Sequence, residues 1–289
     1  MADNTPRIAV IGSVNLDLFT YAETLPRPGE TVTGATLTRH PGGKGANQAI
    51  AAKRLGAEVA FVGCLGNDAF ADEALSLMRT EGVDLSVINT FSDVPTAVAL
   101  IMVGADGENL ITVASGANGA FSDDYVVVPH ADAVLCQLEI PVDTVMVVAE
   151  QVRGRAASLF ALNAAPALPV PDALLAATNL LIVNEHERAA YGSQLDGYRG
   201  LLATTYGVEG AVLSKGGVEL ARARPPKVDV VDTTGAGDAF SAALTVALAR
   251  GDAPGHALEF AVTAGALACM GAGAQPSMPF CSDIAARMV

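Results

Sequence analysis

Short apolar segments that alternate with helical patterns are the feature of this chain that most limits its fold. Apolar on nearly every position, they have the pattern expected of strands buried on both faces of a sheet. The strand candidates are Ala60 to Cys64, Val134 to Leu138, Leu159 to Leu162, Leu180 to Val183 and Ala211 to Leu213. This alternation is typical of an α/β fold with a mostly parallel central sheet and helices on both faces. The 289 residues contain no Ser/Gly-rich or charged linker, so we expect a single domain over residues 1–289 rather than two smaller ones.

Two segments depart from this alternation. Residues 18–40 and 96–114 carry Thr/Val-rich strand patterns that are broken by the turn signals Arg27-Pro28-Gly29 and Gly104-Ala105-Asp106-Gly107. Both faces of Val98 to Val103 are apolar, which makes exposure of either face costly. We expect these segments to form hairpins outside the main sheet.

The stretch DTTGAGDAF, from Asp232 to Phe240, has the pattern of a phosphate-binding turn. The apolar residues between Val228 and Val231 predict a strand before it, and Ala236 to Arg250 predicts a helix after it. Because Gly235 and Gly237 lack a Cβ atom, backbone N–H groups can close around an anion at the positive end of that helix. The pattern therefore predicts an anion cradle.

Asp238 occupies the first turn of the expected helix. An acidic residue there often serves only as a favourable partner of the helix dipole. Alternatively, its carboxylate is a general base that takes a proton from a hydroxyl while the neighbouring N–H groups stabilise a transferring phosphoryl group. The motif alone leaves both roles open.

A second glycine cluster, PGGKGANQA, extends from Pro41 to Ala49. It is not a P-loop, because Gly45 follows Lys44 where that motif requires Ser or Thr. Its glycines allow close approach of a ligand to the backbone, and Asn47 can both donate and accept hydrogen bonds, which suits a polyol. The alternative is a glycine turn that only caps a helix from Lys44 to Leu55.

Polar side chains follow two of the expected strands. Asn15 and Asp17 come after the apolar strand Arg7 to Gly12 and are placed to bind hydroxyl groups, with an Asx turn as the structural alternative. Asn184 and Glu187 follow another strand, where a helix N-cap with an acid in the first turn explains them without any metal.

Composition excludes several classes of function. The formal net charge is −14, from 31 acidic and 17 basic residues, so no basic surface for nucleic acid or anionic membranes is expected. The sequence contains no continuous 18-residue apolar span, and its start, MADNTPRIAV, lacks a basic leader. Four scattered cysteines without a C-x-x-C pair indicate reduced thiols, and we expect a cytoplasmic protein.

Five motifs together resemble a known family. GSVNLD, GGKGANQA, NEHE, DTTGAGD and GAGAQPS occur in the order and spacing of the ribokinase family of carbohydrate kinases, and the resemblance covers nearly the whole chain. It implies a ribokinase-like fold in which residues 18–40 and 96–114 form a small β lid over the sugar, and a homodimer in which two lids clasp each other. It also implies ATP-dependent phosphorylation of D-ribose at O5, giving D-ribose 5-phosphate and ADP. A kinase of another sugar or a nucleoside, and a non-catalytic sugar or nucleotide sensor, are the alternatives.

The resemblance also implies the roles of individual residues in the reaction. Asp238 corresponds to the catalytic base, and the anion hole corresponds to Gly235, Ala236 and Gly237. The positions that hold the sugar, beside Asp238 itself, are Asn15, Asp17, Gly43, Lys44, Asn47 and Glu139. The positions that hold the nucleotide are Asn184, Ser214, Gly216, Gly235 and Gly237.

Two cations are implied in the same way. Glu187, with Asn184, corresponds to a motif that orders Mg²⁺ and the phosphates through water, which fits the hydration that this ion retains. The positions of a monovalent-cation site, usually for K⁺, are Asp232, Thr234, Ala268, Gly271, Gly273 and Ser277. The chain departs from the family at two of them, since family members often carry arginine in place of Gly271 and a different residue in place of Thr234.

Overall fold

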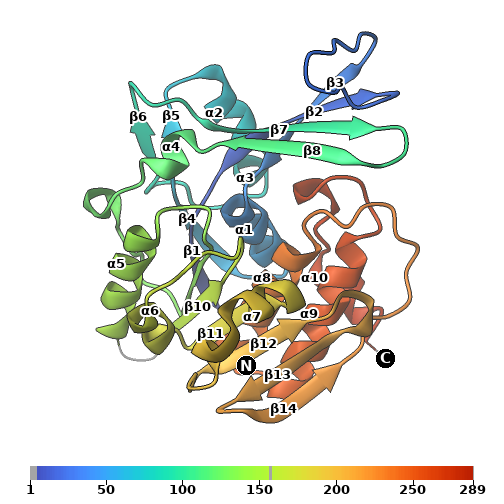
Figure 1. The fold of residues 1–289 in the computed structure, drawn as a ribbon. Coiled ribbons are helices and arrows are strands. Elements are labelled where there is room, and N and C mark those ends of the chain that lie inside the picture. Colours follow the sequence, from blue (N-terminus) through green and yellow to red (C-terminus); the bar gives the residue numbers. More distant parts are fainter. Residues whose placement is uncertain (1–4, 156–157, 289) are drawn as a thin grey trace.

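The computed structural model describes residues 5–155 and 158–288, so the first four residues of the N-terminal segment considered above lie outside it. Three sheets and the helices that pack on them make up the described chain (Figure 1). No helix in these residues is long and apolar enough to cross a bilayer.

An eight-stranded sheet forms the centre of the molecule, in the order β14-β13-β12-β11-β10-β9-β1-β4. From β4 to β12 all neighbouring strands are parallel, whereas β12, β13 and β14 pair antiparallel. The strands are β1 (Arg7–Ile11), β4 (Glu58–Val62), β9 (Ala133–Cys136), β10 (Leu159–Asn163), β11 (Leu180–Asn184), β12 (Leu201–Thr205), β13 (Ala211–Lys215) and β14 (Val218–Ala223). The mostly parallel sheet expected from the sequence is confirmed.

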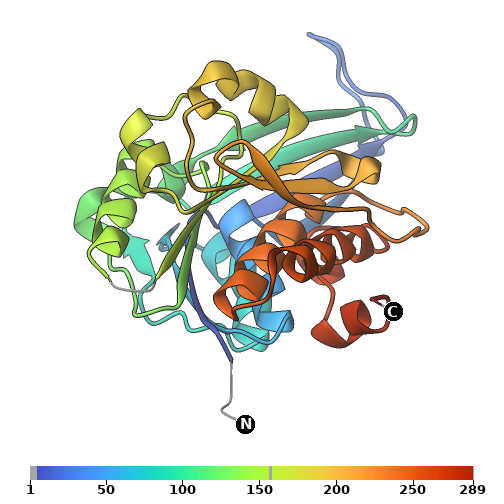
Figure 2. The same ribbon diagram turned by 90° about the horizontal axis from the view of Figure 1, so that it is seen from below.

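Helices cover both faces of this sheet (Figures 1 and 2). Ile8 and Val10 of β1 pack into a core with α1, α8 and α9, while Ala9 and Ile11 pack into a second core with α5 and α6 on the opposite face. Successive side chains of a strand point to opposite faces, which explains why these strands are apolar at nearly every position. The helices are α1 (Lys44–Arg54), α2 (Ala69–Ala74), α3 (Ser76–Thr80), α4 (Gly116–Gly119), α5 (Val142–Arg153), α6 (Asp172–Ala177), α7 (Glu185–Tyr191), α8 (Ala236–Ala249), α9 (Pro254–Ala268) and α10 (Cys281–Ala285).

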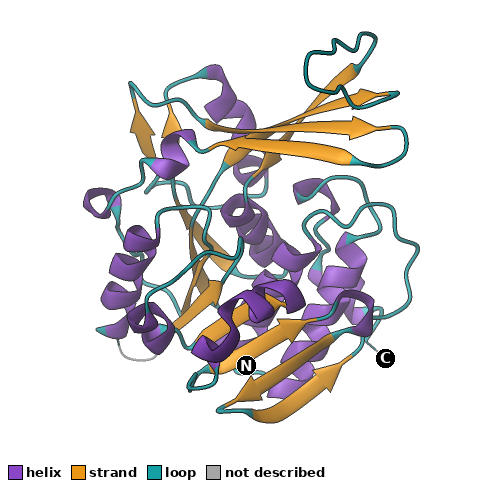
Figure 3. Cartoon of the chain, viewed as in Figure 1, coloured by secondary structure: helices purple, strands orange, loops and turns teal. Residues whose placement is uncertain are grey.

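A four-stranded sheet, in the order β3-β2-β7-β8, projects from the main body at the top of Figure 3. Its strands are β2 (Asn15–Ala22), β3 (Thr36–Gly42), β7 (Ala97–Gly104) and β8 (Asn109–Ala114), and a further small sheet pairs β5 (Cys64–Gly66) with β6 (Asn89–Phe91). Strands β2 and β3 pair antiparallel, as do β7 and β8. The sequence was therefore right that these segments stand outside the main sheet.

The strand predicted between Val228 and Val231 is wrong. These residues form an irregular connection between β14 and α8, and Val230 and Val231 are 58% and 66% exposed. The hairpin of β13 and β14 already completes this edge of the sheet. The connection is instead attached to the end of α9, where the Val231 N–H donates to the Cys269 carbonyl at 2.8 Å.

Candidate active site

The candidate site lies where parallel strands of the main sheet end and two helices begin. Open α/β sheets bind ligands at the carboxyl ends of their strands, and here β1 and β11 lead toward Ser13 and Asn184. Helices α1 and α8 start at the same edge, and their first turns touch through Asn47 and Asp238, 191 positions apart in sequence. The fold thus brings together the motifs that were recognised separately.

The first turn of α8 has backbone donors to offer. Gly235 caps the helix at a φ of +81°, and the Ala236 N–H bonds to the Thr233 carbonyl at 3.2 Å. The regular hydrogen bonds of the helix begin with the Ala239 N–H, which donates to the Gly235 carbonyl at 2.8 Å. Within the described chain, the intervening N–H groups of Gly237 and Asp238 have no protein acceptor. They point from the positive end of the helix and are suited to an anion.

Asp238 is only 4% exposed, although it stands in that first turn. Its Oδ2 accepts a hydrogen bond from Asn47 Nδ2 at 2.9 Å, and its Oδ1 accepts one from Gln48 Nε2 at 2.9 Å. A solvated partner of the helix dipole would not need two side-chain amides to hold it. The carboxylate is instead fixed in orientation, with lone pairs left to accept a proton.

The first turn of α1 is different, because its N–H groups are already bonded. Lys44 N donates to Glu139 Oε2 at 2.9 Å, Gly45 N to Ser13 Oγ at 3.2 Å, and Ala46 N to the Ser13 carbonyl at 2.9 Å. Ser13 Oγ in turn donates to Glu139 Oε2 at 2.6 Å. The first three amides of α1 are therefore not free to bind a phosphate.

Asn15 and Asp17 lie beside this helix start, in strand β2 rather than in an Asx turn. Asn15 Nδ2 donates to Asp17 Oδ1. Gly43 packs against them so closely that a Cβ atom there would lie 2.7 Å from Asn15 Oδ1. Burial, reinforced by the nearby Glu139 carboxylate, raises the pKa of Asp17 to about 7. These groups form a polar wall beside the start of α1.

Lys44 is the cation of the site. The Asp238 carboxylate raises the pKa of Lys44 against the effect of burial, with further contributions from Glu139 and Glu187. These shifts indicate that the Lys44 ammonium group lies within electrostatic reach of the Asp238, Glu139 and Glu187 carboxylates. Lys44 is therefore placed to balance negative charge between the two ends.

Asn184 and Glu187 form a capping box at the start of α7. Glu187 N donates to Asn184 Oδ1 at 2.8 Å, and Asn184 N donates to Glu187 Oε2 at 2.7 Å. This confirms the capping interpretation. Burial raises the pKa of Glu187, and charges of Lys44 and Asp238 act on it, so its carboxyl also lies within the electrostatic reach of the site.

Magnesium fits this site only in hydrated, phosphate-borne form. The described residues contain no group of three or more His, Cys, Asp or Glu side chains that could hold a metal ion. A hydrated ion carried on nucleotide phosphates needs no such cage, and the remaining Glu187 oxygen is a suitable partner for one of its waters.

The expected monovalent-cation residues gather in two segments, one just before the start of α8 and one at the end of α9 and in the loop that follows it. Asp232 accepts hydrogen bonds from Thr234 N and Oγ1 at 2.9 and 2.6 Å and from Gly273 N at 2.9 Å. Ser277 Oγ donates to the carbonyls of Gly273 and Ala274. A Cβ atom on Gly271 would lie 2.8 Å from Ser277 Cβ, so these two residues are neighbours, and Ala268 ends α9 just before them.

Asp232 supplies a negative charge to the candidate monovalent-cation site. Burial opposes its ionisation, but the hydrogen bonds from Thr234 and Gly273 outweigh this and lower its pKa. No basic side chain in the described part of the chain forms an ion pair with it. An ionised carboxylate among backbone carbonyls suits a monovalent cation, which prefers oxygen ligands.

Ser214 and Gly216 do not join the site. Strand β13 runs antiparallel to β12, and its register pairs Ser214 with Leu202 at the start of β12, whereas Asn184 pairs with Thr205 at its end. Both residues therefore lie near the amino-terminal ends of the parallel strands, whereas the site lies at their carboxyl ends. The turn that follows β12 at the site's edge contains Gly207–Glu209, and sequence reasoning missed it because the direction of β13 is not visible in its local pattern.

Two further residues were missed. Gln48 and Ser13 both lie inside motifs that were recognised, GGKGANQA and GSVNLD, but neither was given a role. The available signal was a polar residue at the start of an apolar helix segment, since Gln48 directly precedes Ala49 to Ala52. In the structure Gln48 is completely buried. Buried polar groups need partners, and here the partners are in the site.

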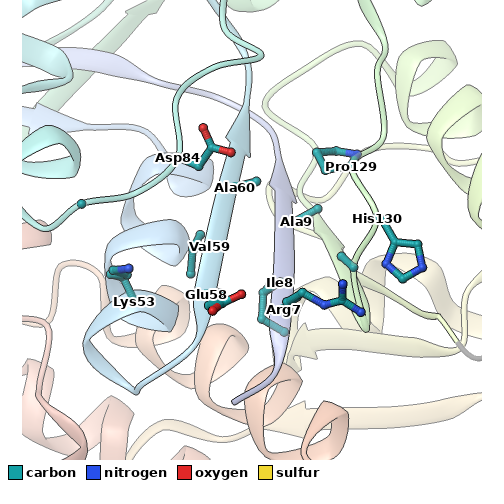
Figure 4. Close-up of a pocket in the computed structure, with 12 residues that line it drawn as sticks. Arg7, Ile8, Ala9, Lys53, Glu58, Val59, Ala60, Asp84, Pro129 and His130 are labelled. Carbon is teal, nitrogen blue, oxygen red and sulfur yellow. The ribbon is translucent and has the colours of Figure 1, made fainter. Parts of the chain in front are cut away.

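A pocket of about 370 Å³ lies elsewhere, beside strands β1 and β4 (Figure 4). Its lining includes the first residues of both strands, Arg7 and Glu58. Lys53 and His130 lie on opposite sides of these strands in the close-up, and Arg7 is bonded to Asp132 at 2.8 and 3.4 Å. The candidate active site, at the carboxyl ends of the parallel strands, is therefore remote from this pocket.

Comparison with known proteins adds three findings. The profile of the pfkB family carbohydrate kinases matches residues 5–281. A ribokinase of Bacillus subtilis is 37% identical, over 96% of this chain and 97% of its own length, and one of Schizosaccharomyces pombe is 34% identical over 94% of each. The solved structure of Arabidopsis thaliana ribokinase complexed with ribose and ATP superposes with a TM-score of 0.85 at 31% identity, covering 98% of both chains.

Proposed function

The chain belongs to the pfkB family of carbohydrate kinases, and from this premise we propose that it is an ATP-dependent kinase that phosphorylates D-ribose at O5. The observation that carries the proposal is the start of α8, where the oriented Asp238 carboxylate stands beside two free N–H groups. Proton acceptance and phosphate stabilisation are the two requirements of phosphoryl transfer to a hydroxyl. The ribokinase relatives supply the identity of the sugar.

The reaction follows from these groups. The O5 hydroxyl gives its proton to Asp238 as its oxygen bonds to the γ-phosphorus, and the bond from that phosphorus to the β–γ bridging oxygen breaks to release ADP. The Gly237 and Asp238 N–H groups stabilise the equatorial oxygens, with Gly235 and Ala236 shaping the turn. Asn47 Oδ1 is buried without a partner, and a sugar hydroxyl would satisfy it.

The sugar rests on the α1 side of the site. Asn15, Asp17 and Glu139 offer acceptors for its hydroxyls, Gly43 allows close approach, and Lys44 balances their charge. Because the α1 amides are bonded within the protein, this side serves a neutral polyol better than an anion.

The nucleotide lies over the ends of β11 and β12. Asn184 and the turn Gly207–Glu209 border that region, and the phosphates then reach Gly235 and Gly237. Glu187 would hold a phosphate-borne Mg²⁺ through water, and the ion would supply charge neutralisation. Potassium is the cation we assign to the Asp232 and Ser277 loops, where it would stabilise the turn that leads into α8.

The four-stranded sheet is the lid of this site and the dimer contact. Strand β8 exposes all its residues, and Leu110, Ile111 and Val113 are 46%, 58% and 59% exposed. An edge strand with exposed apolar side chains on both faces favours pairing with a second copy. We assign the enzyme to the cytoplasm, where ATP is available, as a single-domain homodimer.

Coupled measurement of ADP release tests the function. Mg-ATP is offered with D-ribose, 2-deoxyribose, fructose or adenosine, with K⁺ present or replaced by a bulky organic cation. We expect turnover with ribose that K⁺ stimulates. Preference for another acceptor would retain the mechanism and change the substrate, while ribose binding without ADP formation would contradict the kinase and favour a sensor.

A further inference from the structure

Both oxygens of Asp238 are held by side-chain amides, and one of these belongs to a residue without an assigned role. Gln48, in α1, is completely buried and donates from Nε2 to Asp238 Oδ1 at 2.9 Å. Asn47, its neighbour, holds the other oxygen. Asn47 keeps an unpartnered oxygen for substrate, whereas every polar atom of Gln48 is used within the protein.

The orientation of the Gln48 amide is fixed by two further residues. Gln137 donates from Nε2 to Gln48 Oε1 at 2.6 Å, and Gln48 Nε2 also donates to Asn163 Oδ1 at 3.0 Å. The Gln48 oxygen accepts from one donor and its nitrogen donates to two acceptors. A flip of the side-chain amide would therefore lose all three hydrogen bonds. The donor therefore always faces Asp238.

The network is built into the framework of the sheet. Gln137 follows β9 and Asn163 ends β10, and both are buried. The chain also leaves room for it, since a Cβ atom on Gly12 would collide with Gln137 Oε1. The line Gln137–Gln48–Asp238 thus connects the centre of the sheet to the reacting carboxylate.

We infer that Gln48 is a positioning residue for Asp238, and that Gln137 and Asn163 hold its amide in the productive orientation. The inference rests on the proposed kinase function. Two amide donors fix the orientation of the buried carboxylate and determine which lone pair meets the attacking hydroxyl. Because Gln48 does not face the substrates, its contribution belongs to kcat rather than to KM.

The first test replaces Gln48 by methionine, which has a similar volume and no donor. In Gln48→Met we expect kcat to fall by about 10- to 100-fold, with the KM values for ribose and ATP changed by less than about threefold. Gln151→Met on the exposed face of α5 is the matched control and should match the wild type. An unchanged kcat in Gln48→Met, or a loss confined to KM, would overturn the inference.

A second variant separates positioning from stability. Gln48→Met leaves the Gln137 amide buried without an acceptor, which lowers Tm. The double variant Gln48→Met/Gln137→Met removes that amide as well, so Tm should recover relative to the single variant while kcat stays low. Recovery of kcat together with Tm would mean that Gln48 has only a structural role.

A spectroscopic readout keeps this inference separate from the proposed function. If the wild type turns over no acceptor, the kinase proposal fails, and the bond is tested alone through the side-chain amide resonances of [¹⁵N]Gln-labelled protein. The Gln48 resonances should move in Asp238→Asn and not in Asp196→Asn, an exposed control. Gln48 resonances that stay in place in Asp238→Asn would contradict the contact itself.

Discussion

Helices α1 and α8 both begin with a glycine-rich turn at the same edge of the sheet, yet they offer opposite surfaces to a ligand. Each is capped by a glycine at positive φ, Gly43 at +92° and Gly235 at +81°. At α1 the protein's own Ser13 and Glu139 occupy the first amides. At α8 the amides of Gly237 and Asp238 have no acceptor in the described chain. A glycine-rich helix start is therefore an anion site only where no protein group has taken its donors.

The comparison assigns different chemistry to the two ends. In the proposed function, the α8 end stabilises a transferring phosphoryl group and carries the base, while the α1 end presents acceptors to a neutral sugar. Asn47 and Gln48 join them, because both reach from α1 to Asp238. Substitutions at the α8 end should therefore affect kcat, and those at the α1 end should affect sugar KM.

The largest expected effect is that of Asp238→Asn. Without a carboxylate to accept the O5 proton, kcat should fall by about 10³-fold, while ribose and Mg-ATP still bind with dissociation constants within about threefold of the wild type. Steady-state kinetics and calorimetry measure the two quantities, with Asp196→Asn on the surface as the control. Near-normal turnover would remove Asp238 from the mechanism.

Asp17 tests the charge of the α1 end. The native pKa of Asp17 is about 7 against an ordinary value of 3.8, so between these values the native state keeps a proton that the unfolded state has lost. Asp17 therefore lowers the free energy of unfolding increasingly as pH rises, and this loss of stability is complete above about pH 7. Relative to the wild type, Asp17→Asn should be more stable at pH 8 than at pH 5 by about 2–3 kcal/mol.

Denaturant unfolding at the two pH values measures this difference. The same variant should bind ribose more weakly at pH 8, where the wild-type carboxylate is charged. An Asp17→Asn effect on stability that is independent of pH would show that the carboxyl is not held in this environment.

The two capping glycines sharpen the comparison. A Cβ atom at Gly235 would meet Ala274 and Met278 at 2.9 Å, and one at Gly43 would meet Asn15 Oδ1 at 2.7 Å. We expect Gly235→Ala to lower kcat about tenfold by displacing the start of α8, and Gly43→Ala to raise ribose KM about tenfold by displacing Asn15.

Gly56→Ala controls for backbone strain. Gly56 has a φ of +90°, and a Cβ atom there would meet no other described part of the chain within 4 Å. This variant should therefore lose only about 1–2 kcal/mol of stability and keep both kinetic constants. Equal kinetic effects of Gly43→Ala and Gly235→Ala would contradict separate roles for the two ends.

The smallest effect is expected for Ser13→Ala. Its hydroxyl bridges Glu139 Oε2 and Gly45 N, and its loss should loosen Glu139 and raise ribose KM about threefold with kcat unchanged. Ser76→Ala, where an exposed hydroxyl bonds to the Glu73 carbonyl, is the matched control. A gain in phosphate affinity at α1 in Ser13→Ala would strengthen the comparison, because it would show that the freed Gly45 amide accepts an anion. An unchanged ribose KM would contradict this role of Ser13.

Local patterns were sufficient for the sheet, the separate strands of the lid and the helix starts, because these depend on apolar periodicity and glycine. They failed at Val228 to Val231, where the hairpin β13–β14 had already closed the sheet edge, and at Ser214, where strand direction decides the edge. The occupied amides of α1 were also beyond reach, since Ser13 and Glu139 are 126 positions apart. Long-range contacts, not local propensity, distinguish the two glycine turns.

The central claim is tested most directly by the amide resonances of the two helix starts. Labelling with [¹⁵N]Gly and carbonyl-labelled Lys or Ala selects two Lys–Gly and three Ala–Gly pairs, among them Lys44–Gly45 and Ala236–Gly237. Protein labelled in this way is titrated with Mg-ATP in the presence and absence of ribose. We expect the Gly237 resonance to shift strongly with nucleotide, while the Gly45 resonance stays in place until ribose is added. A nucleotide-dependent shift at Gly45 with none at Gly237 would contradict the account.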